Sequence, residues 1–85
     1  MPTVYTTHYA RVDFIPKSRS DKTDAIIAAI EEVVEKFNLN DTEAFNGNYA
    51  CYPYVIFQNE NKAIVRLAAD YLEASLIKLG CRINP

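Results

Sequence analysis

The chain has 85 residues, of which 49% are hydrophobic and 24% are charged, and its formal net charge at pH 7 is −2. This composition is typical of a globular protein and too apolar for a disordered chain, so we expect a single domain over residues 1–85. The slight acidity argues against nonspecific binding to nucleic acid or to an anionic membrane.

No segment has the length and hydrophobicity of a membrane span, and the first apolar run is interrupted by Thr6, Thr7 and His8, unlike a secretory signal. Cys51 and Cys81 form neither a CxxC motif nor a disulfide framework, which predicts two reduced and largely buried thiols. We therefore expect a soluble, cytoplasmic protein.

Residues 3–15 predict a first β-strand, because Thr, Tyr and Val are crowded there without a glycine. Side chains alternate between the two faces of a strand. One face, suited to a covering helix layer, receives Val4, Ala10, Val12 and Phe14. The other face, suited to solvent or a partner, receives Tyr5, Thr7, Tyr9, Arg11 and Asp13.

A first helix follows, with Ser20 or Asp21 as its cap and residues 38–41 as its end. Its apolar side chains recur at helical spacing. They are Ile26, Ile27, Ile30, Val33, Val34 and Phe37.

Residues 42–45 are a short strand candidate, and Asn46-Gly47 predicts a two-residue hairpin turn before a returning strand over residues 49–57. Pro53 cannot donate a hydrogen bond to a neighbouring strand, so we expect a bulge or a free sheet edge there. Alternation places Cys51, Val55 and Phe57 on one face of the returning strand and Tyr52, Tyr54 and Ile56 on the other.

Asn59 can cap a second helix that runs to Leu79, with Gly80 as its stop. Its predicted apolar stripe consists of Ile64, Leu67, Ala68, Tyr71, Leu72, Leu76 and Leu79. Ile77 lies outside this stripe, among charged residues, and is therefore a candidate contact residue. Residues 81–83 leave room for only a short last strand.

The element order is β-α-β-β-α with a possible final β, which predicts an α+β, ferredoxin-like sandwich. Right-handed crossovers place both helices on one face of a small antiparallel sheet. The uncovered face would display Tyr5, Tyr9, Tyr52 and Tyr54 beside Arg11. Tyrosines suit a partner surface, although tyrosine is also an ordinary strand residue.

The segment Tyr52-Pro53-Tyr54-Val55-Ile56-Phe57 resembles the second half of the RNA-recognition-motif signature on its third strand. The resemblance implies that Tyr52 and Tyr54 stack bases of single-stranded nucleic acid from the open face. The sequence departs from the signature where Ala50 and Cys51 replace a basic residue and glycine, and where Pro53 replaces a small residue. The similarity covers about one strand and the element order.

A second resemblance is to the tautomerase superfamily, and it is carried by Pro2 and by Arg19-Ser20-Asp21 just before a helix. It implies that the amine of Pro2 acts as a general base. Met1 precedes Pro2, so the free amine requires removal of Met1. The interval from Pro2 to the helix also exceeds that of the short members of that superfamily.

The chain contains no catalytic constellation and no phosphate loop. His8 is the single histidine and has no Cys or Asp at ligand spacing, so we predict no metal site and no cofactor. We therefore interpret the chain as a small protein-interaction module, binding a partner protein or a second copy through the open face and the sheet edge. Its size and charge also fit a regulator or inhibitor, such as the small host-directed proteins that phages encode. The alternatives are a single-strand-binding domain and a proline-based tautomerase.

Overall fold

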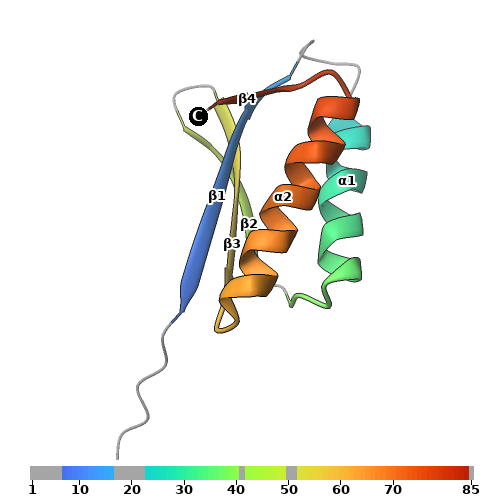
Figure 1. Cartoon of the computed structure of the whole chain (residues 1–85). Helices are drawn as coiled ribbons and strands as arrows, with labels where there is room; N and C mark the ends of the chain where they lie inside the picture. Colours follow the sequence, from blue (N-terminus) through green and yellow to red (C-terminus); the bar gives the residue numbers. More distant parts are fainter. Residues whose placement is uncertain (1–6, 17–22, 41, 50–51, 85) are drawn as a thin grey trace, which may run out of the picture.

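A computed structural model describes residues 7–16, 23–40, 42–49 and 52–84. Their elements are β1 (His8–Ile15), α1 (Thr23–Lys36), β2 (Ala44–Tyr49), β3 (Tyr52–Asn59), α2 (Lys62–Lys78) and β4 (Arg82–Asn84). The four strands form one sheet in the order β2-β3-β1-β4, and every neighbouring pair is antiparallel. Both helices pack on the same face of this sheet, so the fold is α+β with two layers (Figure 1).

The core lies between the sheet and the two helices. β1 and β3 supply the sheet side of it, because Val12, Phe14, Val55 and Phe57 are almost completely buried. The predicted division of β1 and β3 into a covered and an open face is therefore confirmed for the described residues. The helices contribute Ile26, Ala29, Val33, Val65, Ala68, Ala69, Leu72 and Leu76.

The β2–β3 hairpin differs from the prediction. Asn46 and Gly47 are not the turn but lie inside β2, opposite Val55 and Tyr54 of β3. The pairing continues to Tyr49 opposite Tyr52, so the connection falls at residues 50–51, outside the described part of the chain. Gly47 has no positive φ, which is why the usual turn signal of Asn-Gly does not apply here.

Pro53 lies in a central strand, not at a free edge, and it pairs with Asn48 of β2. The β1–β3 pairing ends at Asp13 opposite Tyr54, one residue before Pro53 would be reached. Since proline has no N–H to donate, the β1–β3 ladder stops where this donor would be needed.

The second helix begins later than predicted. Its N-cap is Asn61, whose side chain accepts a hydrogen bond from the Ala63 N–H, and Asn59 instead accepts from the Asn61 N–H at 2.8 Å. Gly80, with φ 88°, follows the C-cap Leu79, so the predicted stop is confirmed.

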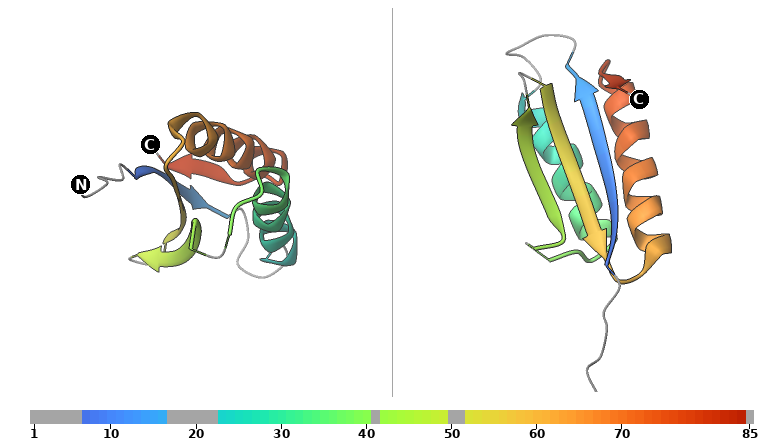
Figure 2. Two further views of the ribbon diagram at one scale, coloured as in Figure 1. Left: turned by 90° about the horizontal axis from the view of Figure 1, so that it is seen from below. Right: turned by 90° about the vertical axis from the view of Figure 1, so that its left-hand side faces the viewer.

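The buried stripe of α2 is rotated relative to the prediction. Val65 and Ala69 are buried, whereas Leu67 is 55% exposed. The cause is the position of α2, which lies against β1 and β4 at the side of the sheet as well as against α1 (Figure 2). Val65 and Ala69 face β1 and are therefore covered.

β4 is as short as predicted but spans Arg82–Asn84, one residue later than expected. It pairs with β1 at Asp13, Phe14 and Ile15, so the His8 end of β1 lies beyond the end of β4. Cys81 is a buried free thiol, as predicted, and Cys51 lies outside the described residues.

Candidate functional site

The register of the sheet brings together side chains from three strands on the face opposite the helices. Phe45, Ile56 and Arg11 form one row across β2, β3 and β1. Gly47, Tyr54 and Asp13 form the next row in one direction along the strands. In the opposite direction the next row contains Tyr9 and Gln58. We call the group Tyr9, Arg11, Asp13, Phe45, Tyr54 and Ile56 the open face.

Two aromatic side chains of the open face are strongly exposed. Tyr9 is 67% and Phe45 is 45% exposed, while Tyr54 and Ile56 are half-buried between their neighbours. Exposed aromatic side chains are typical anchors of protein interfaces, because each can bury a large area at a small entropy cost.

Tyr54 lies flat on the sheet because of Gly47. A Cβ atom at position 47 would lie only 2.8 Å from the Tyr54 hydroxyl oxygen, so the ring occupies the space that any other residue would fill. Arg11 covers this ring, with its Cζ atom 4.2 Å from the ring centre. The three residues therefore form a layered group of glycine, aromatic ring and guanidinium.

Asp13 holds the guanidinium in place. Arg11 Nε donates to both carboxylate oxygens of Asp13, at 3.1 and 3.0 Å, and Arg11 Nη2 lies 3.0 Å from Asp13 Oδ1. The charge at the centre of the open face is therefore neutralised. Arg82 pairs with Ile15 and therefore lies on the same side of the sheet as the open face. The described strand residues on this side carry two arginines and one aspartate.

The structure brings together only part of the predicted site. Tyr9, Arg11 and Tyr54 share the open face, as predicted. Ile77 is 59% exposed, as the helical wheel predicts, but it belongs to α2 in the helix layer and cannot join the tyrosines in one contact. Tyr5 and the side chain of Tyr52 lie outside the described part of the chain.

Phe45 and Ile56 belong to the open face but were not among the predicted site residues. If Asn46-Gly47 is a turn, the preceding strand ends at Phe45, and the pairing of Phe45 with Ile56 is not predicted. Strand alternation already assigned Ile56 to the face of Tyr54, and this was the signal that could have found it.

A separate polar contact links the two helices. The Tyr71 hydroxyl of α2 donates a hydrogen bond of 2.6 Å to Glu32 of α1, and the ring packs edge-on against Phe37. The hydrogen bond to Glu32, and the negative charge of that carboxylate, raise the pKa of Tyr71 above its usual value of 10.0. Lys36 lies over the same ring, 5.1 Å from its centre.

Within the described ranges, no helix is long and apolar enough to cross a membrane, and no group of three or more His, Cys, Asp or Glu side chains could hold a metal ion. Comparisons with protein families, with curated proteins and with solved structures found no significant match to this chain. We therefore infer the function from the geometry of the open face and of the sheet edge.

Proposed function

We propose that the fold is ferredoxin-like, as the element order predicts. The support is the order β2-β3-β1-β4, in which β1 lies between β3 and β4 and is antiparallel to both. Each helix then connects two parallel strands that have one strand between them, the split β-α-β arrangement.

We propose that the protein is a small interaction module that binds a partner protein through the open face. The observation that carries this proposal is the pair of exposed aromatic side chains, Tyr9 and Phe45, beside Tyr54 and Ile56 on a face that neither helix covers. A domain of this kind acts by occupying a surface of its partner, which is the mode of action of a regulator or an inhibitor.

The arrangement around Tyr54 favours protein over single-stranded nucleic acid. Base stacking needs an accessible aromatic ring face, and Arg11 occupies one face of Tyr54. Single-strand-binding grooves also concentrate positive charge along the path of the backbone, whereas Asp13 neutralises Arg11 and leaves Arg82 as the one further charge among the described strand residues on this side. An RNA-recognition-like activity is therefore the second candidate. The tautomerase alternative depends on Pro2, outside the described residues, and is tested by whether Met1 is retained in the mature protein.

The experiment is affinity capture from the native cell, with protein and nucleic acid identified in the same eluate. The bait proteins are the natural sequence and a variant carrying Tyr9→Ser and Phe45→Ser. We expect a specific protein to be captured by the natural sequence and lost with the variant, because these two side chains supply most of the exposed aromatic area of the open face.

The matched control carries Ile27→Ser and Leu67→Ser, which remove two exposed apolar side chains from the helix layer. This control should capture the same protein as the natural sequence. Equal loss from both variants would contradict a role for the open face. Capture of single-stranded nucleic acid that weakens steeply with salt would support the second candidate instead.

A further inference from the structure

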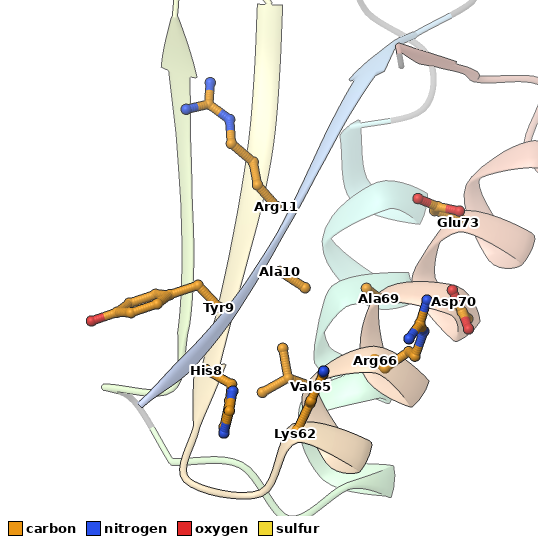
Figure 3. A pocket seen from close by; sticks show the side chains of 10 residues that line it. All are labelled: His8, Tyr9, Ala10, Arg11, Lys62, Val65, Arg66, Ala69, Asp70 and Glu73. Atoms are coloured by element: carbon orange, nitrogen blue, oxygen red, sulfur yellow. The ribbon is translucent and has the colours of Figure 1, made fainter. Parts of the chain in front are cut away.

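A groove runs along the edge of the sheet between the His8 end of β1 and the helix α2, with a volume of about 390 Å³ (Figure 3). Its apolar wall consists of the half-buried Ala10 from β1 and of the nearly buried Val65 and Ala69 from α2, which form its floor. The side chains of Tyr9 and Arg11 point to the other side of β1, so these two residues line the groove with their backbone. The groove is therefore distinct from the open face.

The backbone of Tyr9 is directed into this groove. Gln58 donates its N–H to the carbonyl of Glu43, on the β2 side of β3. N–H and C=O groups alternate in direction along a strand, so those of Phe57 point towards β1. Ala10 lies opposite Phe57, and its N–H and C=O point towards β3. Tyr9 is the next residue and therefore directs its N–H and C=O away from β3, towards the groove.

The groove continues the path of β4. β4 pairs with β1 at Asp13, Phe14 and Ile15, and the groove lies beside the residues that precede them. Seen from the open face, α2 extends past the edge of β1 (right view of Figure 2). An extended segment placed in the groove would therefore pair with β1 along one side and be covered by α2 on its inner face.

The charged side chains of α2 make the two ends of the groove different in charge. Lys62 lies at the His8 end and Glu73 lies towards the other end, beyond Ala10, while Arg66 and Asp70 lie beside each other between them (Figure 3). A segment with an acidic side chain near Lys62 and a basic side chain near Glu73 would be complementary to both ends. Charge complementarity of this kind selects register and orientation more than it adds affinity.

We propose that the groove binds an extended segment of a partner protein as an added strand antiparallel to β1. The segment carries a basic residue near its start, small apolar residues at alternate positions in its middle, and an acidic residue near its end. Antiparallel pairing is the direction that β4 already takes on this edge. This second contact deepens the proposed interaction function but uses none of the side chains of the open face.

A second copy of the chain does not suit this edge. Two β1 strands joined antiparallel would lie about 4.8 Å apart, with both α2 helices on the same side of the joined sheet. Packed helices need about 8–10 Å between their axes, and each α2 extends past its own β1 towards the other copy. The two helices would therefore collide.

The test uses two blocked peptides of the same composition and opposite order, acetyl-Lys-Thr-Val-Thr-Val-Thr-Glu-amide and acetyl-Glu-Thr-Val-Thr-Val-Thr-Lys-amide. Each is titrated into the full chain while amide hydrogen exchange is followed by NMR. We expect the first peptide to slow exchange of the Tyr9 amide and to bind about fivefold more tightly than the second, because in the antiparallel orientation only the first matches both charged ends.

A variant with Lys62→Glu, Arg66→Glu, Asp70→Lys and Glu73→Lys should reverse this preference while keeping the net charge. The matched control, Glu31→Lys with Lys78→Glu, changes charges outside the groove and should keep the natural preference. The Tyr9→Ser, Phe45→Ser variant should still bind the first peptide, which separates this proposal from the function of the open face. Absence of Tyr9 protection at millimolar peptide, equal binding of both peptides, or protection of Tyr9 by self-association alone would overturn the proposal.

Discussion

Gly47 makes room for an aromatic ring rather than for a turn. Its position opposite Tyr54 leaves the space that the ring fills, and the ring in turn supports Arg11. This glycine therefore shapes the open face and does not form the turn of the β2–β3 hairpin.

We predict that Gly47→Ala displaces the Tyr54 ring and separates it from Arg11 without unfolding the protein. The new Cβ would conflict with the flexible outer end of Tyr54, 2.8 Å away, and not with backbone. Loss of an exposed cation–π contact costs about 0.5–1 kcal/mol. Replacement of a strand glycine gains about the same amount, so stability should change by less than about 1 kcal/mol.

NMR checks this through the ring-current shift of the Arg11 side-chain protons, which should move towards their values in an unstructured peptide. An unchanged shift in the variant would contradict the layered arrangement of Gly47, Tyr54 and Arg11.

Two neighbouring residues of α2 should respond very differently to substitution. Leu76 is completely buried and Ile77 is exposed. We predict that Ile77→Lys changes stability by no more than about 0.5 kcal/mol. Leu76→Ala should cost about 2–5 kcal/mol, because it leaves a cavity in the core. Chemical denaturation measures both, and a large loss with Ile77→Lys would place Ile77 in the core.

At the level of elements, the contact between α1 and α2 includes one polar link that depends on pH. Tyr71 donates a hydrogen bond to Glu32 only while its hydroxyl is protonated. The raised pKa of Tyr71 means that the folded state holds this proton more tightly than the unfolded state does. The link therefore stabilises the fold fully below pH 10.0, and this contribution is lost as the pH rises through the higher folded-state pKa.

We predict that the melting temperature of the natural sequence falls more steeply above pH 10.0 than that of Tyr71→Phe. The Phe variant retains the edge-on packing against Phe37 and lacks only the hydroxyl, so other titrating groups affect both proteins equally. Thermal melts from pH 8 to pH 12 provide the measurement. Parallel curves for the two proteins would show that the hydrogen bond to Glu32 does not contribute.

At the scale of the whole molecule, the sheet order determines which amides are protected. The N–H of Ala10 is directed towards β3, in the middle of the sheet, whereas that of Tyr9 is directed towards the groove. We predict that in the free protein the Ala10 amide exchanges at least about a hundredfold more slowly than that of Tyr9, because only its opening requires disruption of the β1–β3 ladder.

Hydrogen exchange followed by NMR checks this prediction on the protein without peptide. Val12, which shares the direction of Ala10 and lies opposite Val55, serves as an internal reference for a protected amide. Fast exchange at Ala10 with protection at Tyr9 would mean that β1 is shifted by one residue, which would also exchange its two faces.

Alternation was sufficient to predict the faces of the central strands. In β1 the apolar Ala10, Val12 and Phe14 alternate with Tyr9, Arg11 and Asp13. The predicted covered faces of both strands hold the side chains that the structure buries, which are Val12, Phe14, Val55 and Phe57. The local sequence was not sufficient to predict the structure of Asn46-Gly47. This dipeptide can form a turn or continue a strand, and here it pairs with Val55 and Tyr54 of β3. The start of α2 was misplaced for a related reason, since both Asn59 and Asn61 can act as caps and each makes a local hydrogen bond.

The sequence by itself determined the types and order of the elements, the open side of the sheet and the exposure of Ile77. These features depend on periodicity and on local hydrogen bonding, which neighbouring residues control. Only the tertiary structure decided that Phe45 lies in a row with Ile56, that Gly47 leaves space for the Tyr54 ring, and that α2 turns Val65 and Ala69 towards β1 beside a groove. Those features require residues far apart in the chain to become neighbours, and strand register and helix position are set by the packing of the whole core.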